Sequence, residues 1–355
     1  MIVWHVPDDG SGQNSYGHLL SKCLRARGVT ITGVAYSHFF SLRVLAHRPD
    51  VLHFEFISPY ILPHQSDAVP VAILKGILFV TQAALLRLAG IRLVWTMHRP
   101  TNYERRFVHV EWFFSLIFTR IAHVLVAHGR GSRRAFIAHF SLQRATRHVQ
   151  EMPHPSFIGG YPNEMSRDDA RKELGVDPNA RMFLILGQIR GYKNVPQAIA
   201  AFTRATAAGD GNELWVVGAP IDRAVADDVH RCAAEHQDVR LVLEHVPDER
   251  LQLYLNACDF VVLNYAISSS GVAILAMSFA RAVIAARGNG MEQTLDERGA
   301  IFFDRDDPHG LDEAFCRGVA MVDRSAEMGQ SNFNNVSRWS LDDAAAQFVK
   351  WYTRS

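Results

Sequence analysis

The chain has 355 residues, of which 48% are hydrophobic, 10% aromatic and 21% charged. This composition is typical of an ordinary globular protein and excludes a disordered, collagen-like or coiled-coil chain. At about 150 residues per domain, the length predicts two domains. Four widely spaced cysteines without a Cys-x-x-Cys pair predict neither a zinc site nor a disulfide framework, and therefore a reducing compartment. The N-terminus lacks the features of a signal peptide, and no membrane-spanning helix is expected.

Charge is divided unevenly along the chain. Residues 1–150 hold 17 lysines and arginines against 7 aspartates and glutamates, whereas the remainder holds 20 against 29. The first part therefore has a formal charge of +10 and the second a formal charge of −9. Twelve of the 17 histidines also lie in the first part. A basic domain of this kind could meet nucleic acid, an anionic membrane or a phosphorylated small molecule.

The first half of the chain predicts strands that alternate with helices. An apolar strand at residues 2–6 is followed by a polar loop and then by apolar residues at helical spacing. In this loop, Gly10, Gly12 and Asn14 could let an acceptor or a sugar approach the backbone closely. A dinucleotide-binding motif is the alternative, but its third glycine is missing. Further strands, consistent with parallel βαβ units, are predicted at residues 30–34, 51–54, 92–96 and 124–127.

A segment rich in proline and glycine, residues 152–163, interrupts the hydrophobic pattern and predicts a domain junction. Beyond it, strands are predicted at residues 182–186, 214–217, 239–243, 260–263 and 282–285. The sequence therefore predicts an α/β protein with two doubly wound, Rossmann-like domains. Because ligands of open α/β sheets bind beyond the carboxyl ends of the strands, we expect the two domains to face a central cleft that holds the site.

Two turns of the second half, each between a strand and a helix, have the composition of an anion-binding site. The first turn offers cations and backbone N–H groups that suit a diphosphate, from Gly187, Gln188, Arg190 and Lys193. The second offers hydroxyls, amides and a helix dipole that favour a phosphate oxygen, from Ser268, Ser269, Ser270 and Gly271. A solvated turn and ordinary helix capping are the alternatives for each turn taken alone. Together the turns favour a nucleotide diphosphate.

Several segments of this half resemble, in order and spacing, the nucleotide-sugar domain of GT-B glycosyltransferases of the family 4 type. They are residues 188–193, 246–255, 269–285, 290–292 and 339–340. The resemblance covers residues 120–345 well and the first 120 residues weakly. It implies an N-terminal acceptor-binding domain, a C-terminal nucleotide-sugar-binding domain and a terminal helix that packs back onto the first domain, over residues 1–152, 153–335 and 336–355. It also implies donor contacts from Val246 and Glu292.

Residues 153–163 are similar to a subgroup of this family that includes bacterial exopolysaccharide enzymes. Within it, the GDP-mannose:glycolipid 4-β-mannosyltransferases are the most similar. The resemblance implies a nucleotide-sugar donor, with GDP-mannose favoured, and a lipid-linked glycan as the acceptor. It implies a role in exopolysaccharide synthesis.

The chain departs from the family at two positions. Retaining members carry two glutamates on the second turn and its helix, and the matching residues here are Ile267 and Leu275. The second glutamate of the family clamps the ribose, so the ribose must be held differently in this chain. We therefore expect an inverting transfer assisted by a base. A retaining transferase that uses a UDP-sugar and a non-catalytic nucleotide-sugar binding protein remain the alternatives.

Candidates for this base follow strands of the first domain. His98 comes after the strand at residues 92–96, at a position where the family has a sugar-contacting histidine, and Glu104 lies in the same loop. Glu55 follows the strand at residues 51–54 among apolar residues, where a charge is costly unless it has a partner. A structural histidine and surface carboxylates are the alternatives.

No metal ion or cofactor is expected. Arg190, Lys193 and the helix terminus at Gly271 would neutralise the charge of the leaving diphosphate. Residues 304–307 have the Asp-x-Asp spacing of metal-dependent transferases, but they resemble an ordinary loop of the family. The histidines of the first half form no compact His-x3-His pair of the kind that binds metal.

The first domain is expected to contact a membrane. Residues 69–88 are mostly apolar, and two arginines at 105–106 precede an aromatic stretch, as in helices that lie in a membrane interface. Buried helices that cover a sheet have the same composition. The basic charge favours the inner leaflet, and therefore a cytoplasmic enzyme associated peripherally with the membrane. Nucleic acid is not expected as a partner, because the aromatic residues lie in apolar runs rather than among basic residues.

Overall fold

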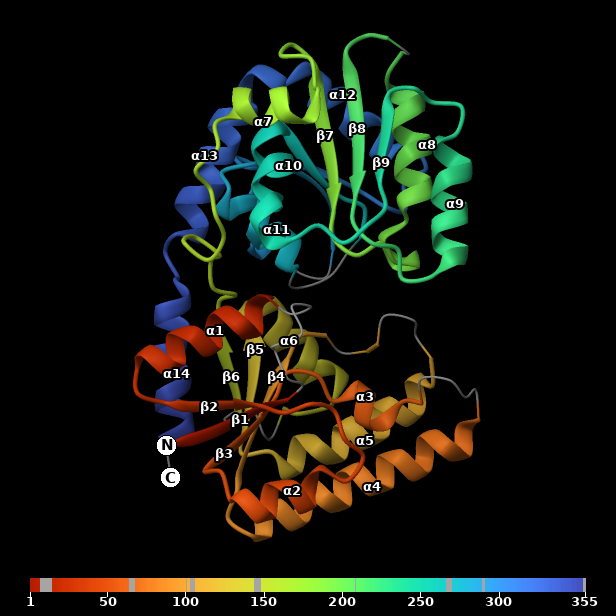
Figure 1. Ribbon diagram of the computed structural model, residues 1–355. Coiled ribbons are helices and arrows are strands. Elements are labelled where there is room, and N and C mark those ends of the chain that lie inside the picture. The colour runs from red at the N-terminus through yellow and green to blue at the C-terminus, as the bar shows by residue number, and fades with distance from the viewer. Residues whose placement is uncertain are drawn as a thin grey trace. The chain divides into compact units, whose positions relative to one another are not determined.

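Two compact units, each built around a parallel six-stranded sheet, make up the computed structural model (Figure 1). The N-terminal unit contains Met1–Pro155 and Leu341–Ser355, and the C-terminal unit contains Ser156–Ser340. The structure describes residues 1–6, 15–63, 68–99, 101–102, 106–143, 148–207, 209–265, 270–288 and 291–353. Helices cover both faces of each sheet, so the prediction of an α/β protein with two doubly wound sheets is confirmed.

The sheet of the N-terminal unit has the strand order β2-β1-β3-β4-β5-β6. Its strands are β1 (Ile2–Val6), β2 (Thr30–Gly33), β3 (Val51–Phe54), β4 (Arg92–Met97), β5 (Val124–His128) and β6 (Val149–Met152). Its helices are α1 (Ser15–Ala26), α2 (Phe40–His47), α3 (Ser58–Ile61), α4 (Val69–Leu88), α5 (Val108–Ile121), α6 (Gly129–His139) and α14 (Leu341–Thr353). The inner strands are buried on both faces, which explains their nearly continuous apolar runs.

Alternation along these strands sends two kinds of side chain to the two faces of the sheet. Phe54 and Trp95 join the large apolar core formed with α2, α4, α5 and α6. His5, His53 and Thr96 point to the opposite face, where α1 and α14 cover them. One face is therefore apolar, whereas the other holds a buried polar cluster.

The sheet of the C-terminal unit has the strand order β12-β11-β10-β7-β8-β9. Its strands are β7 (Arg181–Leu186), β8 (Asn212–Val217), β9 (Val239–Val242), β10 (Phe260–Leu263), β11 (Ala282–Ala286) and β12 (Ala300–Phe303). Its helices are α7 (Arg167–Leu174), α8 (Val195–Ala205), α9 (Arg223–Ala233), α10 (Leu251–Ala257), α11 (Gly271–Ser278), α12 (Gly310–Ala320) and α13 (Ser325–Val336). Short 3-10 turns occur at η3 (Gly191–Lys193), η4 (Asp248–Arg250), η5 (Met291–Gln293) and η6 (Val322–Arg324).

Two strands, β6 and β12, were not expected from the sequence. Both are edge strands of four residues. β6 reads Val-Gln-Glu-Met and places two polar side chains in its centre. These polar residues weaken the apolar pattern of β6, as an edge strand allows. β12 reads Ala-Ile-Phe-Phe and is buried throughout, so its pattern was apolar but short.

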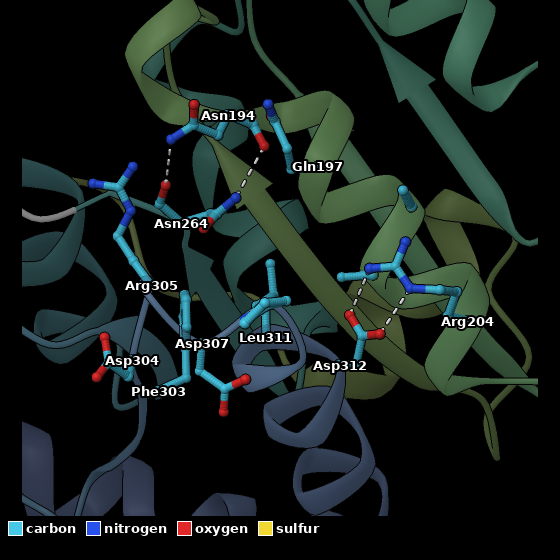
Figure 2. A pocket seen from close by; sticks show the side chains of 13 residues that line it. Asn194, Gln197, Arg204, Asn264, Phe303, Asp304, Arg305, Asp307, Leu311 and Asp312 are labelled. Carbon is cyan, nitrogen blue, oxygen red and sulfur yellow. Dashed lines mark hydrogen bonds and ion pairs between the residues drawn. The ribbon is translucent and has the colours of Figure 1, made fainter.

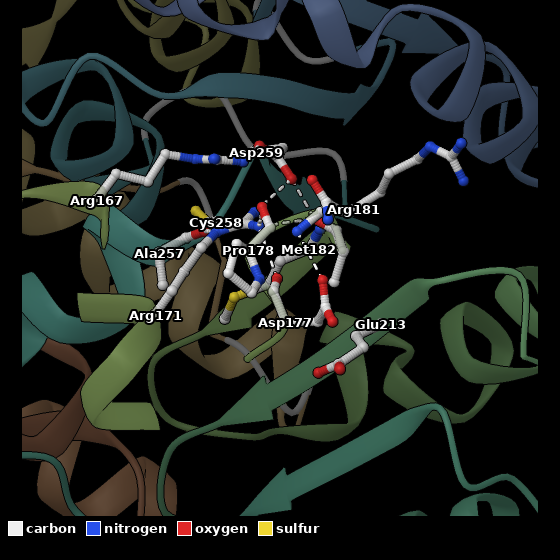
Figure 3. Close-up of polar contacts among 12 residues, drawn as sticks. Arg167, Arg171, Asp177, Pro178, Arg181, Met182, Glu213, Ala257, Cys258 and Asp259 are labelled. Carbon is white, nitrogen blue, oxygen red and sulfur yellow. Dashed lines mark hydrogen bonds and ion pairs between the residues drawn. The ribbon is translucent and has the colours of Figure 1, made fainter. Parts of the chain in front are cut away.

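A buried charge cluster fixes the amino ends of strands in the C-terminal unit (Figure 3). Asp259, 5% exposed, accepts hydrogen bonds from Arg171 (3.0 Å), Arg167 (2.6 Å) and the backbone N–H of Met182 (2.8 Å). The guanidinium of Arg171, a residue 1% exposed, also donates to the backbone carbonyl oxygens of Asp177, Pro178, Ala180 and Ala257. The cluster thereby ties α7 to β7 and β10, at the end of the sheet away from the carboxyl ends of the strands.

Helix α4 has the length and hydropathy of a membrane span. It has 20 residues, with a mean hydropathy of 1.9 over an 18-residue window of which 33% is buried, and it is the one such helix among the described residues. Lys75, Gln82 and Arg87 interrupt the apolar run but leave it within these limits, so the prediction that no helix spans a membrane stays a prediction. Length and composition alone do not distinguish a membrane span from a core helix.

Candidate active site

Four neighbouring strands of the N-terminal unit carry polar side chains at their carboxyl ends. Glu55 follows β3, His98 follows β4, His128 ends β5, and His154 lies two residues beyond β6. The ring centroids of His98 and His128 are 5.3 Å apart, and those of His128 and His154 are 4.8 Å apart. Parallel strands end at the same edge of a sheet, so these side chains form one polar cluster there.

His98 and Glu55, two of the candidates for the base, form a hydrogen-bonded pair. The Nε2 of His98 lies 2.8 Å from the Oε2 of Glu55. The side chain of His98 is 18% exposed and that of Glu55 is 2% exposed. The His98 ring stacks on Phe56, with centroids 4.8 Å apart. A buried carboxylate thus orients a partly exposed imidazole, which is the arrangement of a general base and the group that positions it.

The charge of Glu55 decides which nitrogen of His98 can act as the base. Burial raises the pKa of Glu55, but neighbouring His53 and the hydrogen bond from His98 outweigh burial and lower this pKa below its ordinary value. Glu55 is therefore ionised at neutral pH and can only accept hydrogen bonds. The proton of a neutral His98 must then lie on Nε2, which leaves the lone pair of Nδ1 available. Among the described residues, Nδ1 of His98 has no hydrogen-bond partner.

His128, His154 and Tyr16 belong to the same cluster but were not proposed as site residues from the sequence. Burial lowers the pKa of His128 well below its ordinary value and that of His154 to about 4, so both rings are neutral at pH 7. The ring of Tyr16 lies 5.8, 5.5 and 5.1 Å from those of His98, His128 and His154. The position of His128 directly after the strand predicted at residues 124–127 was an available signal, whereas the strand before His154 was not predicted.

One group of described residues, His5, His53 and Glu55, has possible metal-ligand atoms within 4.8 Å of one another. Both ring nitrogens of His53 already have partners, because Nδ1 lies 2.7 Å from the hydroxyl of Tyr352 and Nε2 lies 2.7 Å from that of Thr96. A metal ion would have to displace one of these contacts. The group therefore fits a hydrogen-bonded cluster better than a metal centre.

Six of the predicted site residues lie outside the described part of the chain, so the structure places none of them. Four of these belong to the N-terminal half. They are Glu104 and the three residues of the first loop, Gly10, Gly12 and Asn14. The same holds for Ser268 and Ser269 of the second anion-binding turn, and for Ile267.

In the C-terminal unit, the first predicted anion-binding turn follows β7 and depends on two glycines. Gly187 has a φ of 86°, in the left-handed region that favours glycine. Gly218, which follows β8, has a φ of 143°, and a Cβ atom there would lie 2.5 Å from the carbonyl oxygen of Gly187. The two glycines thus allow the ends of β7 and β8 to approach closely.

The turn brings two cations together. Lys193, 5% exposed, donates from Nζ to the carbonyl oxygen of Leu186 at 3.0 Å. Burial and, to a smaller extent, the charge of Arg190 lower the pKa of Lys193 to about 7. Arg190 donates from Nε to Oε1 of the exposed Gln188 at 2.8 Å. Keeping a buried lysine protonated beside a second cation is unfavourable in free energy, and an anion bound at the turn would stabilise the protonated form.

Reciprocal amide hydrogen bonds tie this turn to the second turn (Figure 2). Asn194 donates from Nδ2 to the carbonyl oxygen of Asn264 at 3.2 Å, and Asn264 donates from Nδ2 to that of Asn194 at 3.0 Å. Asn194 has a φ of 49°, a conformation that asparagine adopts more readily than most residues. Both asparagines were part of the predicted turns, but this role was missed because it depends on a contact across 70 residues.

The two asparagines line a cavity of about 320 Å³ between α8 and α12, drawn in Figure 2. Its wall includes Asp304 and Asp307 of the Asp-x-Asp loop. Asp304 accepts a hydrogen bond from the backbone N–H of Asp306 at 2.9 Å, and Asp307 accepts one from that of His309 at 2.9 Å. These carboxylates therefore hold the loop before α12 in shape.

In the second turn, the side chain of Ser270 is engaged within the protein. Ser270 is 2% exposed, and its Oγ accepts a hydrogen bond from the backbone N–H of Ala273 at 3.2 Å and lies 3.0 Å from the hydroxyl of Tyr265. It caps α11, so the backbone of the exposed Gly271 is left to face a ligand. Leu275, at a position where the family has a glutamate, is 7% exposed.

The remaining predicted donor residues also follow carboxyl ends of strands. Val246 is half-buried and lies in the loop between β9 and η4. Glu292, in η5 beyond β11, is exposed and accepts a hydrogen bond from the backbone N–H of Gly288 at 2.9 Å. The structure thus places the described donor candidates in loops that follow β7, β9, β10 and β11.

Comparison with solved structures agrees with this architecture. The structure of the Anabaena protein Alr3699/HepE with UDP and glucose matches with a TM-score of 0.75 and 14% identity, covering 100% of this chain and 99% of that one. Sucrose-phosphate synthase from Thermosynechococcus elongatus matches with a TM-score of 0.76 and 16% identity, covering 99% and 98%. The fold is that of the GT-B glycosyltransferases.

Sequence comparison matches parts of this chain to glycosyltransferases. Residues 180–320 match the family model described as "Glycosyl transferases group 1". D-inositol 3-phosphate glycosyltransferase of Corynebacterium kroppenstedtii is 25% identical over 198 residues, 54% of this chain and 44% of that protein. D-inositol 3-phosphate glycosyltransferase 2 of Catenulispora acidiphila is 26% identical over 196 residues, 52% and 46%. The alignment thus spans less than half the length of these two relatives.

Proposed function

We propose that this protein is an inverting, metal-independent glycosyltransferase that moves a sugar from a nucleotide-diphosphate donor to an acceptor hydroxyl. The observation that carries the proposal is the pair of His98 and Glu55 at the carboxyl edge of the N-terminal sheet. The GT-B fold and the match of residues 180–320 to the glycosyl transferases group 1 model support the reaction class.

The reaction follows from the geometry of the pair. Nδ1 of His98 takes the proton of the acceptor hydroxyl while the oxygen attacks the anomeric carbon. The bond between that carbon and the diphosphate oxygen breaks, and its electron pair leaves with the diphosphate. Glu55 stabilises the imidazolium that forms. General base catalysis of this kind contributes about 10²- to 10⁴-fold in rate.

The donor diphosphate is proposed to lie against the turn that follows β7. Arg190 and Lys193 supply positive charge, and Gly187 and Gly271 let the phosphate oxygens approach the backbone. The phosphate charge would restore the proton of Lys193 and offset its burial. This arrangement stabilises the leaving group without a metal ion.

GDP-mannose is proposed as the donor because residues 153–163 resemble those of GDP-mannose-dependent exopolysaccharide enzymes. UDP-sugars are the competing class, since the Anabaena protein of the same fold was solved with UDP and glucose. A thermal-shift panel of GDP, UDP, ADP and dTDP, with and without magnesium, separates these donors by mass action. Stabilisation by GDP without metal supports the proposal. Stabilisation by UDP alone would indicate a UDP-sugar donor in place of GDP-mannose.

The stereochemistry of the product tests the mechanism. Transfer from an α-linked nucleotide sugar to a synthetic glycolipid should give a β-linked product, read from the anomeric proton coupling or one-bond carbon–proton coupling by NMR. An α-linked product would indicate a retaining transferase and remove His98 from the role of base. Tight donor binding without hydrolysis or transfer would indicate a nucleotide-sugar binding protein.

The acceptor is proposed to be a lipid-linked glycan, reached by peripheral association with the cytoplasmic face of the membrane. Support comes from α4, where Lys75 and Gln82 have hydrogen-bond partners within the protein, although Thr81 and Arg87 are exposed. Lys75 donates from Nζ to the carbonyl oxygens of Pro59 (3.0 Å) and Leu62 (2.6 Å), and Gln82 accepts from the hydroxyl of Ser41 at 2.8 Å. The residues of α4 that are at least 40% exposed are mostly apolar, and include Val69, Val71, Ile73, Leu74, Ile77, Leu85 and Leu88.

An exposed face this apolar is not expected for a helix that covers a sheet in water. Neighbouring helices add Leu42 of α2 and Phe113 of α5, which are 70% and 51% exposed. The exposed Arg43 and Arg48 lie on and directly after α2, and neither α2 nor α4 contains an acidic residue. An apolar face beside basic side chains suits an anionic bilayer.

Vesicle flotation tests the membrane proposal. The protein should float with vesicles that contain phosphatidylglycerol, and the double variant Leu74→Asp, Ile77→Asp should not. Ile221→Asp is the matched control, because Ile221 is 42% exposed but lies in the C-terminal unit. Flotation of the double variant at the level of the control would exclude α4 as the membrane contact.

A further inference from the structure

A chain of buried polar side chains connects the C-terminal helix α14 to Glu55. The hydroxyl of Tyr352 lies 2.7 Å from Nδ1 of His53 and 3.2 Å from Nε2 of His5. At one end, Nδ1 of His5 lies 3.2 Å from the hydroxyl of Ser21 on α1. At the other end, Nε2 of His53 lies 3.5 Å from Oε1 of Glu55. All five side chains belong to residues less than 5% exposed, so they are shielded from water.

The charge of Glu55 decides which atom donates and which accepts in each hydrogen bond of this series of side chains. The ionised carboxylate lies 3.5 Å from Nε2 of His53, so its charge favours the proton of this ring on Nε2. This Nε2–H hydrogen-bonds to the hydroxyl of Thr96 at 2.7 Å, and Oε1 of Glu55 itself accepts no hydrogen bond from the described residues. Nδ1 of His53 must then accept, and the hydroxyl of Tyr352 is the donor. His53 carries one proton only, because burial lowers its pKa to about 3.

The same reasoning assigns the donors at His5 and Ser21, at the other end of this series of side chains. With the proton of Tyr352 directed to His53, the phenol oxygen can accept from the Nε2–H of His5, which also lies 3.2 Å from Nδ1 of His53. Nδ1 of His5 then accepts from the hydroxyl of Ser21. Each donor points toward Glu55, and hydrogen bonds aligned in one direction strengthen one another.

We propose that Tyr352 is a positioning residue for the base, acting through His53 and Glu55. By donating to Nδ1 of His53, it keeps the proton of that ring facing Glu55. Glu55 then holds the proton of His98 on Nε2 and leaves Nδ1 of His98 for the acceptor hydroxyl. The inference rests on the proposed function of His98. It gives the C-terminal helix α14 a role in positioning the catalytic base.

The surroundings of His53 fit this role. The ring of Phe348, one turn earlier on α14, lies 5.0 Å from that of His53, so the helix also holds the ring by packing. His98 is faced by Glu55 and His53 from β3, by Tyr16 from α1, by His128 from β5 and by His154 beyond β6. Of these groups, only His53 and Glu55 are in the chain that leads to Tyr352.

Tyr352→Phe removes the donor and keeps the ring. Tyr60→Phe is the matched control, because the hydroxyl of Tyr60 is buried in the same unit and has no hydrogen-bond partner among the described residues. The imidazole nitrogens of the folded proteins are observed by ¹⁵N NMR, which reports the tautomer of each histidine without substrate. The wild type and Tyr60→Phe should show His53 and His98 protonated on Nε2, whereas Tyr352→Phe should show a mixture at His53.

Kinetics give the second readout. Tyr352→Phe should lower kcat about tenfold with an unchanged KM for the donor, and it should shift the acidic limb of the kcat/KM profile to higher pH. The shift has this sign because the Nδ1–H tautomer of His53 turns the lone pair of Nε2 toward Glu55, so the carboxylate stabilises a protonated His98 more strongly. Ser21→Ala, at the far end of the chain, should act in the same direction with a smaller effect and serves if Tyr352→Phe does not fold.

The two readouts separate the outcomes. Unchanged tautomers of His53 and His98 in both Tyr352→Phe and Ser21→Ala would overturn the positioning role, whatever the activity. A tautomer change without any effect on kcat or its pH profile would overturn the link to catalysis. If His98→Ala transfers sugar at the wild-type rate, the proposed function fails, and the NMR result still decides whether Tyr352 sets the tautomer.

Discussion

The two units each bury a charged cluster, and the clusters differ in how completely their polar atoms are satisfied. In the C-terminal unit, both carboxylate oxygens of Asp259 accept hydrogen bonds, and Arg171 donates from all three guanidinium nitrogens. In the N-terminal unit, Oε1 of Glu55 and the hydroxyl of Tyr16 are buried without a hydrogen-bond partner among the described residues.

The difference agrees with a structural role for the Asp259 cluster and with the proposed catalytic role for the Glu55 cluster. Buried polar groups are normally satisfied because an unmade hydrogen bond costs about 1 to 3 kcal/mol. The Asp259 cluster follows this rule and lies at the amino ends of the strands. The Glu55 cluster breaks it at the carboxyl ends, where α/β folds bind their ligands. Incomplete satisfaction at that edge supports the proposed role of these groups in binding a substrate.

The largest expected effect on activity comes from replacing His98, which tests the proposed role of the Glu55 cluster. His98→Ala should lower kcat per folded molecule by about 10²- to 10⁴-fold, because the reaction loses its base. It should also lower the melting temperature, because the buried Glu55 loses its hydrogen bond from His98. Steady-state transfer assays and a thermal scan measure both quantities. His109→Ala, at an exposed histidine of α5, is the control. Equal rates for the two variants would exclude His98 as the base.

Asp259→Ala should produce the opposite result. The substitution leaves Arg171 as a buried cation without its carboxylate, and breaking such a pair costs about 3 to 5 kcal/mol in the free energy of unfolding. Denaturant unfolding followed by circular dichroism measures this loss. The kcat per folded molecule should remain that of the wild type. A loss below about 1 kcal/mol would show that the cluster contributes little to stability.

Lys193 shares features of both clusters. It is buried in the C-terminal unit, as Asp259 is, but it is proposed to bind the donor diphosphate. Its pKa of about 7 in the free protein would rise when a diphosphate binds. Donor affinity should therefore be constant below about pH 7 and fall by up to about tenfold per pH unit above it, because binding must then take up a proton. Calorimetry with GDP-mannose in two buffers of different ionisation enthalpy measures this proton uptake.

Substitution of Lys193 sharpens this prediction. Lys193→Met should weaken donor binding by about 1.5 to 3 kcal/mol at pH 7 and abolish the proton uptake, and Arg190→Ala should weaken binding by a similar amount. The exposed Lys172 of α7 provides the control variant Lys172→Met. Unchanged donor affinity in Lys193→Met and Arg190→Ala would exclude the turn after β7 as the diphosphate site.

The contrast between the units also shows what the sequence could predict. The apolar runs and the turns between them were sufficient for ten strands and for the doubly wound architecture, because central parallel strands have strong local patterns. The pairing of His98 with Glu55 was beyond sequence reasoning, since the two residues are 43 positions apart and meet only through the strand order.

Two further features depended on contacts between distant segments. Tyr352 was expected to pack as part of an aromatic terminal helix, but its hydroxyl contacts His53 across 299 positions. Asp259 and Arg171 had no local signal, because a single arginine on a polar helix is usually exposed. Patterns along the chain therefore predicted elements and turns, whereas the partners of buried charges required the sheet topology.

The smallest expected effect comes from an exposed ion pair, which completes the comparison. Arg204 of α8 donates two hydrogen bonds of 2.7 Å to Asp312 of α12, at the cavity drawn in Figure 2. The geometry is as favourable as that of Asp259, but the side chain of Arg204 is 55% exposed, so water screens the charges. Arg204→Ala should lower the free energy of unfolding by only about 0.2 to 1 kcal/mol, measured by denaturant titration beside Asp259→Ala. A loss as large as that of Asp259→Ala would show that hydrogen-bond geometry, and not burial, sets the contribution of these clusters.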